Sequence, residues 1–380
     1  MKFGQYYAFH KATVLPDRCS IGWEVHQSKA MNNARINTTD STLSPDGVRN
    51  SDRGNPRDAV SGAIIHDRLR LVEAQCCLCE TEDSEKVAGG EDFEYRTSDD
   101  NFAVSQCQQC GLVYLNPRPA LSEFEKIYPA TYHAFEFSQK EFGFVYKVRK
   151  RLEARRLLSW CKNLSKDARI LDVGCGDGFH LGLLKEFGEK GWKLEGVDLD
   201  PRAVDIGRKA GLNIHQGSLD TVRLPESAYD LIILVQTVEH VAEPVELLRR
   251  IRLLLRPGGR LVVVTDNTGS LDFQLFRKRY WGGYHFPRHW YLFNPSTMKK
   301  LALSAGFSVE NISTQVSPVN WTYSIHNWLV DRKTPDWITG FFTLRSTLAL
   351  SFFTVFDMIN QRFGKGALIN AHLRKPGNPG

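Results

Sequence analysis

The stretch Ile170-Leu-Asp-Val-Gly-Cys-Gly-Asp-Gly178 decides the fold, because an apolar strand pattern runs directly into three glycines and then into a helical pattern. Glycine permits the positive φ angles of a tight turn and lets a ligand approach the backbone, while the start of the following helix offers unpaired N–H groups. A dinucleotide-binding loop has the spacing G-x-G-x-x-G, which would place its third glycine at Phe179. The observed G-x-G-x-G spacing therefore indicates a different ligand.

A carboxylate follows at the end of the next predicted strand, where Asp198 closes the run Leu194-Glu-Gly-Val-Asp198. At the carboxyl end of a parallel strand, such a carboxylate can accept both hydrogen bonds of a ribose diol. The alternative is purely structural: the glycines form a tight strand-to-helix turn, and Asp198 caps the helix that starts near Pro201. The glycine spacing and the acid together favour a ribose-containing ligand.

The sequence from residue 168 onward alternates short apolar runs with amphipathic helical patterns. This alternation is typical of a parallel sheet with helices on both faces, so we expect an α/β fold. The predicted strands cover residues 169–173, 193–197, 213–216, 231–234, 260–265, 307–314 and 367–374. The predicted helices cover residues 180–188, 201–209, 244–255 and 295–305.

The glycine loop, with Asp172 two residues before the first glycine, resembles the cofactor site of class I S-adenosylmethionine-dependent methyltransferases. The resemblance extends over roughly residues 168–315 and implies a Rossmann-like, seven-stranded methyltransferase sheet with S-adenosyl-L-methionine as cofactor. By this resemblance, the methionine part is held by Asp172, Gly174, Cys175, Gly176 and Gly178, the ribose by Asp198 with Leu199 beside it, the adenine by Ser218 and Leu219, and the underside of the cofactor by Gln236.

Two C-x-x-C pairs, Cys76/Cys79 and Cys107/Cys110, precede the predicted sheet. Four thiolates in a tetrahedron suit zinc and leave no open position for catalysis, so the metal would be structural. Cys77 leaves open which thiols bind, and five simply buried cysteines are the alternative. The run from Cys110 to Pro119 resembles the N-terminal zinc-ribbon-like unit of methyltransferases in sugar and polysaccharide biosynthesis, although zinc ribbons also serve ribosomal-RNA methyltransferases.

The loop over residues 280–293 is rich in histidine, arginine and aromatic residues, and it follows the fifth strand, where ligands bind in open α/β sheets. Its segment from Pro287 onward resembles the same group of methyltransferases, in which this histidine faces the acceptor. His289 is therefore the first candidate for the general base, with packing beneath the next helix as the alternative. His240, after the fourth strand, is a catalytic or structural candidate. Arg288 is predicted to bind an anionic acceptor.

The expected organisation has four parts: a disordered segment at residues 1–70, a zinc-ribbon-like unit at 71–119, a helical connector at 120–166, and a methyltransferase domain at 167–376. A helical insertion is expected at about residues 320–364. Arg345 and Asp357 interrupt its apolar part, residues 337–359, which is expected to pack on the protein or lie on a membrane surface rather than span a bilayer. The N-terminus lacks the apolar core of a secretory signal, which predicts a cytoplasmic protein with reduced thiols.

The predicted function is S-adenosylmethionine-dependent methylation of a small molecule, with a sugar, nucleotide-sugar or polysaccharide-related acceptor. One alternative is an RNA methyltransferase that grips RNA with the ribbon and the basic cluster at residues 147–156. The formal net charge of +6 is only mildly basic and disfavours that alternative. The other alternative is a non-catalytic scaffold that retains the cofactor fold.

Overall fold

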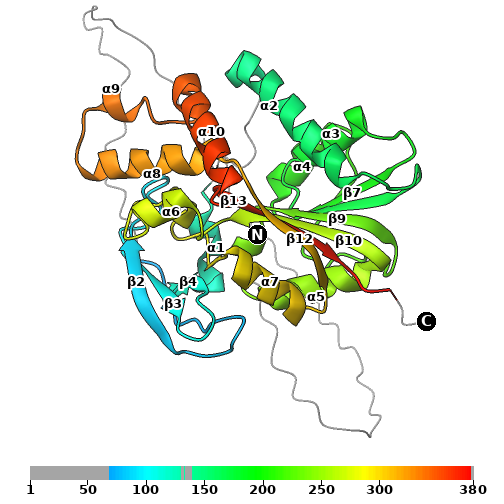
Figure 1. The fold of residues 1–380 in the computed structure, drawn as a ribbon, viewed down its shortest axis with the longest axis horizontal. Helices are drawn as coiled ribbons and strands as arrows, with labels where there is room; N and C mark the ends of the chain where they lie inside the picture. The colour runs from blue at the N-terminus through cyan, green and yellow to red at the C-terminus, as the bar shows by residue number, and fades with distance from the viewer. Residues whose placement is uncertain (1–67, 130–131, 133–138, 378–380) are drawn as a thin grey trace, which may run out of the picture. The chain divides into compact units, whose positions relative to one another are not determined.

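The structure is a computed structural model that describes residues 68–129, 132 and 139–377. All of these belong to one unit, His66–Gly380 (Figure 1). Residues 1–67 of the segment predicted to be disordered lie outside the described part of the chain.

A seven-stranded sheet forms the larger part of this unit, in the order β12-β13-β10-β9-β6-β7-β8. All its strands are parallel except β13, which lies antiparallel between β10 and β12. The strands are β6 (Arg169–Val173), β7 (Lys193–Asp198), β8 (Ile214–Gln216), β9 (Tyr229–Val235), β10 (Leu255–Asp266), β12 (Ser308–Gln315) and β13 (Leu368–Arg374). The predicted α/β methyltransferase-type sheet is confirmed.

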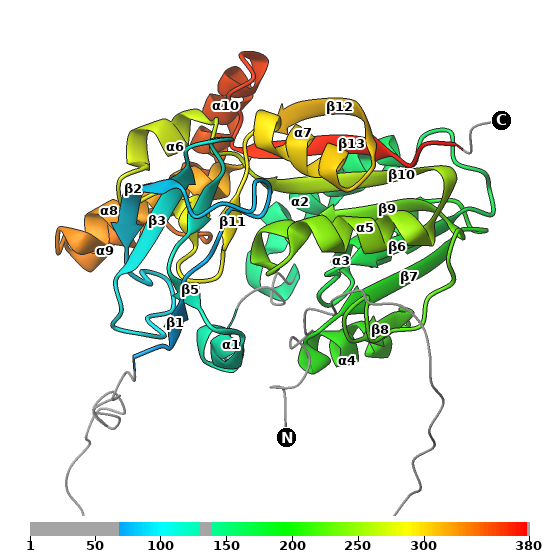
Figure 2. The ribbon, with the colours of Figure 1, turned by 90° about the horizontal axis from the view of Figure 1, so that it is seen from below.

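Helices cover both faces of this sheet because the central strands are apolar on both faces. Ile170 and Leu231 share one core cluster with Leu157 of α2 and Leu183 of α3. Residues of the opposite alternation, such as Ile232, pack with α5 and α7. Figure 2 shows α5 and α7 in front of the sheet and α2 and α3 behind it. The helices are α2 (Gln139–Trp160), α3 (Phe179–Phe187), α4 (Pro201–Lys209), α5 (Pro244–Leu254) and α7 (Pro295–Ser304).

The cysteine-bearing segment forms a second, smaller sheet in the order β11-β4-β3-β2. Its strands are β2 (Ser84–Gly90), β3 (Phe102–Cys107), β4 (Val113–Leu115) and β11 (Tyr291–Leu292), and the short strands β1 (Leu71–Val72) and β5 (Arg118–Pro119) pair beside it. Strand β11 comes from the loop that was predicted to face the acceptor, and it pairs antiparallel with β4. The cysteine unit and that loop therefore share one sheet.

The remaining helices belong to the connector before the large sheet, to the segment after β10 and to the late insertion. The connector contains η1 (Leu121–Glu123) and α1 (Phe124–Ile127) before α2, and the short helix α6 (Leu271–Phe276) follows β10. The late insertion forms α8 (Pro318–Asp331), α9 (Asp336–Thr339) and α10 (Thr347–Arg362), as predicted. Within the described residues, none of the helices combines the length and the apolar character that crossing a membrane requires.

Candidate cofactor and acceptor sites

The glycine loop after β6 has the backbone geometry that its sequence predicts. Gly174, Gly176 and Gly178 have φ angles of 72°, 55° and 82°, which lie in the left-handed region. A Cβ atom at Gly174 would lie 2.3 Å from Thr237 Oγ1, and one at Gly178 would lie 2.5 Å from Leu212 Cδ1. The loop thus requires glycine at both positions. It packs directly against Thr237, the residue after the cofactor candidate Gln236.

Asp198 fastens this loop to the end of β7. Its Oδ2 atom accepts a hydrogen bond from the Gly176 N–H at 2.8 Å, and its Oδ1 atom accepts one from the Asp200 N–H at 2.8 Å. Burial raises the pKa of the Asp198 carboxyl. An ionised carboxylate has about four lone-pair sites, so both oxygens can still accept hydrogen bonds from a ligand.

Asp172 carries a buried carboxylate beneath the loop. The side chain is 1% exposed, and neither oxygen accepts a hydrogen bond from the described residues. His180 Nδ1 lies 3.6 Å from its Oδ2 atom, which is beyond hydrogen-bond distance. A buried carboxylate without donors is costly, so this site fits a ligand that brings N–H groups.

The remaining cofactor candidates lie at the carboxyl ends of β6 to β9. Gly217 N–H donates to the Asp198 carbonyl at 2.9 Å, which places Ser218 and the buried Leu219 beside β7. Gln236 follows β9 in the left-handed conformation with φ 49°, and its exposed side chain bonds to Asp266. Cys175 is buried within the loop, and Leu199 is half-buried directly after Asp198. The fold therefore gathers the residues that the resemblance implied.

The four predicted zinc ligands also come together. The Sγ atoms of Cys76, Cys79, Cys107 and Cys110 all lie within 4.8 Å of one another. Gly111, with φ 75°, allows its N–H to bond back to the Cys107 carbonyl at 2.9 Å, which is a knuckle turn. Cys77 lies outside the group.

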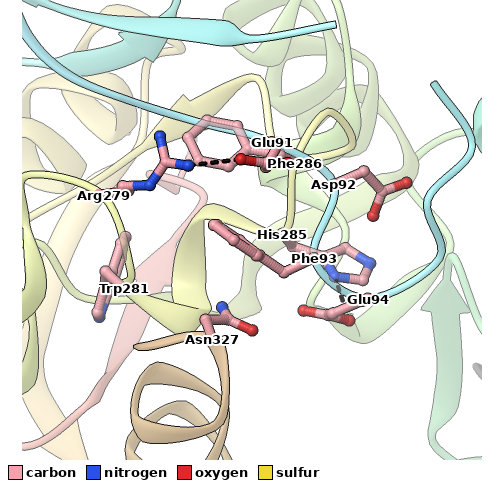
Figure 3. Close-up of a pocket in the computed structure, with 9 residues that line it drawn as sticks. All are labelled: Glu91, Asp92, Phe93, Glu94, Arg279, Trp281, His285, Phe286 and Asn327. Atoms are coloured by element: carbon pink, nitrogen blue, oxygen red, sulfur yellow. Dashed lines mark hydrogen bonds and ion pairs between the residues drawn. The ribbon is translucent and has the colours of Figure 1, made fainter. Parts of the chain in front are cut away.

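The loop between β10 and β11 forms one wall of a small, shallow hollow that is open to solvent. The lining residues come from this loop, from the segment after β2 and from α8, and they are Glu91, Asp92, Phe93, Glu94, Arg279, Trp281, His285, Phe286 and Asn327 (Figure 3). The carboxylates therefore come from the cysteine unit, whereas the histidine comes from the large domain.

His285 is the imidazole that reaches this pocket. It follows the short helix η4 (Gly282–Tyr284) with φ 39°, an uncommon conformation for a residue other than glycine. Its Nδ1 atom lies 2.9 Å from Glu94 Oε2, and its Nε2 atom lies 3.4 Å from the Tyr132 hydroxyl. Figure 3 shows the Glu94 and His285 side chains side by side at one edge of the pocket.

The two predicted catalytic histidines lie behind His285. The buried His289 ring has its Nδ1 atom 2.8 Å from the Gly283 carbonyl and 3.3 Å from Asp266 Oδ2. His240 Nδ1 lies 2.9 Å from the Tyr128 hydroxyl. The ring centroids of His240 and His289 are 4.5 Å apart, and those of His285 and His289 are 5.0 Å apart. Burial lowers the pKa of His240 to about 3 and that of His289 well below its ordinary value, so both rings are neutral at neutral pH.

Two buried carboxyls flank these rings. Glu239 Oε2 accepts a hydrogen bond from Thr265 Oγ1 at 2.8 Å, while its Oε1 atom has no partner among the described residues. Burial and the charge of neighbouring carboxylates raise the pKa of both Glu239 and Asp266. One ligand atom each from Glu239, His240 and His289 lies within 4.8 Å of the other two, a donor set that suits a divalent cation.

Arg288, predicted to bind an anionic acceptor, points inward. Its side chain is 0% exposed and pairs with Asp92 at 2.9 Å and 3.2 Å. The remaining N–H groups donate to the carbonyls of Ile127 and Phe286 and to Thr97 Oγ1. With its donors thus occupied, Arg288 joins the cysteine unit to the acceptor loop and is a positioning residue in this structure.

Comparison with known proteins identifies the segment that forms most of the large sheet. A family model described as a methyltransferase domain matches residues 144–312. The ubiquinone biosynthesis O-methyltransferase of Cereibacter sphaeroides (strain ATCC 17025) is 29% identical over 169 residues, which cover 41% of this chain and 67% of that protein. The chain carries a class I S-adenosylmethionine-dependent methyltransferase domain. The glycine loop after β6 lies within the matched residues.

Two further similarities accompany this methyltransferase domain. A ubiquinone biosynthesis O-methyltransferase of Xanthomonas oryzae pv. oryzae (strain PXO99A) is 31% identical over 115 residues, which cover 28% of this chain and 47% of that protein. The solved structure of geranyl diphosphate C-methyltransferase from Streptomyces coelicolor A3(2) covers 63% of this chain and 82% of its own, with 14% identity and a TM-score of 0.43.

From the sequence, His285 was included only as part of the loop over residues 280–293, and Glu94 was not considered. His285 carried a usable signal, because it lies four residues before His289 in a loop already assigned to the acceptor. Glu94 carried none. It belongs to a polar segment of the cysteine unit, and only the packing of that unit on the methyltransferase domain brings it to the pocket.

Proposed function

We propose that this methyltransferase methylates a hydroxyl group of a small, neutral, hydroxyl-rich acceptor of the sugar class, and that His285 accepts the hydroxyl proton. The observation that carries this proposal is the Glu94–His285 pair in the wall of the pocket. The curated relatives from Cereibacter and Xanthomonas are named as O-methyltransferases, which supports an oxygen acceptor.

The charges around the pocket favour a neutral acceptor over a phosphorylated one. Of the lining carboxylates, Glu91 is paired with Arg279, Asp92 is paired with the buried Arg288, and Glu94 lies beside His285. Carboxylates accept hydrogen bonds from hydroxyl groups and repel phosphates. Phe93 and Trp281 add aromatic surface to the lining, which suits the apolar face of a sugar ring.

The cofactor site is suited to S-adenosylmethionine. The unpartnered Asp172 carboxylate would receive the amino group, and Asp198 would receive the ribose hydroxyls. When bound, the cofactor supplies a methyl group that is already activated on a sulfonium sulfur. The protein's task is therefore to align the acceptor and take up its proton.

Contacts between neighbouring residues connect the two sites. The glycine loop packs on Thr237, and Glu239 and His240 follow in the short helix η3 (Val238–His240). The ring of His240 contacts His289, which in turn contacts His285. A relay of ring contacts through His240 and His289 therefore links the pocket residue His285 to the short helix that follows Thr237.

With the cofactor bound, its methyl group would be available for transfer to the acceptor oxygen, and His285 Nε2 would take up the proton that the hydroxyl group releases. Glu94 accepts the Nδ1–H bond, which orients the ring and leaves Nε2, 3.4 Å from the Tyr132 hydroxyl, as the basic nitrogen. His289 is less suited to this step. Its side chain is 7% exposed and lies behind His285.

The test compares His285→Ala with His289→Ala, with formation of S-adenosylhomocysteine measured on neutral sugars, nucleotide sugars and a ribosomal-RNA fragment. We expect His285→Ala to lower kcat by about 100-fold or more while cofactor affinity is unchanged. Glu94→Gln should fall between that variant and the parent. Neutral sugars should be the best acceptors. Full turnover by His285→Ala would refute its role as base, and preferred methylation of the RNA would refute the acceptor class.

Cofactor choice is tested separately by calorimetry on the purified protein. We expect S-adenosylmethionine to bind and NAD to give no heat, because Phe179 occupies the position of the third dinucleotide glycine. Binding of NAD without S-adenosylmethionine would contradict the assignment of the glycine loop.

We also infer that the four-cysteine group holds a structural zinc ion. Four sulfur ligands within 4.8 Å of one another, two of them fully buried, match a closed tetrahedral site. Elemental analysis should find about one zinc per chain, and Cys107→Ser should lose it. Cys77→Ser is the matched control, because this neighbouring thiol lies outside the group, and it should keep the metal. Absence of zinc from the parent protein would refute the inference.

A further inference from the structure

Helix α10, together with Phe363 directly after it, displays a row of large apolar side chains to solvent. The exposed residues and their exposed fractions are Leu348 (71%), Phe352 (64%), Val355 (60%), Met358 (54%), Ile359 (53%) and Phe363 (75%). Most are spaced three or four residues apart, so they lie on one face of the helix. We call these six residues the α10 stripe.

The opposite face of α10 is fixed to the rest of the protein. Asp357 is fully buried and accepts hydrogen bonds from the Ser317 N–H, Trp321 Nε1 and the Ala367 N–H. The Phe353 and Trp321 rings stack with centroids 5.9 Å apart. The helix therefore cannot turn its stripe inward without breaking a buried polar network. Figure 2 shows α10 projecting at the top of the view, on the opposite side from β8 and α4.

Exposed cations surround the stripe in sequence. Between residues 332 and 365, the exposed charged residues are Arg332, Lys333, Asp336, Arg345, Arg362 and Lys365. Five of the six are positive. The segment that leads into α10 also exposes Trp337 at 80% and Phe341 at 44%. Aromatic residues and long cations beside an apolar helix face are typical of helices that lie in a membrane interface.

We propose that α10 binds the surface of an anionic lipid bilayer, with the α10 stripe in the boundary between headgroups and acyl chains and the flanking cations at the headgroups. Cations near an anionic bilayer surface strengthen binding. A second copy of the chain fits this surface less well, because a symmetric contact through α10 would bring the cations of the two copies together. The proposal is independent of the acceptor and of the catalytic base.

The experiment is flotation of the purified full-length protein with vesicles of phosphatidylcholine alone or with about one third phosphatidylglycerol, at low and high salt. We expect binding to the anionic vesicles that weakens with salt. The variant Phe352→Gln/Val355→Gln/Ile359→Gln should lower the partition coefficient about tenfold or more. Arg345→Gln/Arg362→Gln/Lys365→Gln should bind the two vesicle types alike.

The matched control is Ile206→Gln/Leu253→Gln/Leu303→Gln, which removes exposed apolar side chains from α4, α5 and α7, and it should float like the parent. Thermal unfolding checks that all variants are folded, and light scattering reports the oligomeric state. The proposal is overturned if the parent fails to float with anionic vesicles or if the stripe variant floats equally well. It is also overturned if the stripe variant only converts a dimer to a monomer.

Discussion

Asp172 is the residue at which cofactor binding and stability of the free protein oppose each other. Its buried carboxylate accepts no hydrogen bond from the described residues, yet it lies under the glycine loop. Asp172→Asn should therefore raise the free energy of unfolding of the cofactor-free protein by about 1 to 3 kcal/mol. The same change should weaken S-adenosylmethionine about tenfold or more, because a charge-assisted hydrogen bond is lost. Urea denaturation and calorimetry measure the two effects.

Asp205→Asn is the control for this prediction. Asp205 lies on the exposed face of α4, where its ion pair with Lys209 contributes little, so both quantities should remain unchanged. A variant at Asp172 that lowers stability and affinity together would mean that the carboxylate supports the fold rather than the ligand.

Asp272 gives a pH dependence with a definite sign. Burial raises the pKa of its carboxyl from 3.8 to about 6, and Trp281 Nε1 donates to it at 2.7 Å. The folded protein keeps this proton up to about pH 6, whereas the unfolded chain releases it near pH 4. Between these values the folded state binds more protons, so this residue's contribution to stability falls as pH rises.

Asp272→Asn removes that titration while leaving an oxygen that can accept the Trp281 bond. The free energy of unfolding of the variant minus that of the parent should increase by roughly 2 to 3 kcal/mol between pH 4 and pH 6. Above pH 6 this difference should stay constant. Urea denaturation of both proteins at several pH values measures the difference. A difference that stays constant across this window would contradict the assigned pKa.

Among the structural elements, the contact between the β2–β3 loop and the acceptor loop depends on the Arg288–Asp92 pair. Both side chains are fully buried in this ion pair, and removing one partner leaves a buried charge without its counterion. Asp92→Ala should lower the free energy of unfolding by about 3 to 5 kcal/mol. It should also reduce turnover, because Glu94 and His285 lie on the two segments that the pair joins.

The control is Arg279→Gln, which breaks more exposed pairs with Glu91 and Asp331 between neighbouring segments. It should cost less than about 1 kcal/mol. Equal losses for the two variants, measured by denaturation, would show that burial does not govern the strength of these contacts.

On the scale of the whole molecule, the cysteine unit and the methyltransferase domain share one apolar core. A single cluster of buried residues includes Cys76 and Leu115 of the cysteine unit and Ile232 and Leu301 of the large domain. Strand β4 also takes its outer neighbour, β11, from the acceptor loop. Residues 68–377 should therefore unfold in one calorimetric transition, with matching calorimetric and van't Hoff enthalpies.

A zinc chelator should shift that whole transition to lower temperature rather than create a separate one. A fragment of residues 68–120 should remain unfolded even with zinc, because it lacks β11 and most of the shared core. Two independent transitions, or a folded fragment, would contradict the shared core.

Much of this architecture follows from local patterns. The strands and helices of the large sheet agree with their predicted ranges within a few residues, since their apolar periods are strong. Strand β10 is the main difference, because it already begins at Leu255 and includes the Pro257-Gly-Gly259 turn as a register irregularity before Arg260. The pairing of Leu255 with Tyr229 of β9 extends the strand past a turn that local rules assign to its boundary.

The sequence by itself was enough to predict the large sheet and the kind of cofactor. The glycine loop, Asp172 and Asp198 lie close together in the chain, so their spacing predicts how they are arranged around a ligand. The sequence also predicted that the two C-x-x-C pairs come together in one group of four cysteines. Only the tertiary structure decided the Glu94–His285 pair, which we propose as part of the acceptor site. Glu94 and His285 are separated by almost two hundred residues, and the buried Arg288–Asp92 pair and the shared β4–β11 edge bring them together. Such long-range contacts depend on the packing of two units, which no local pattern records.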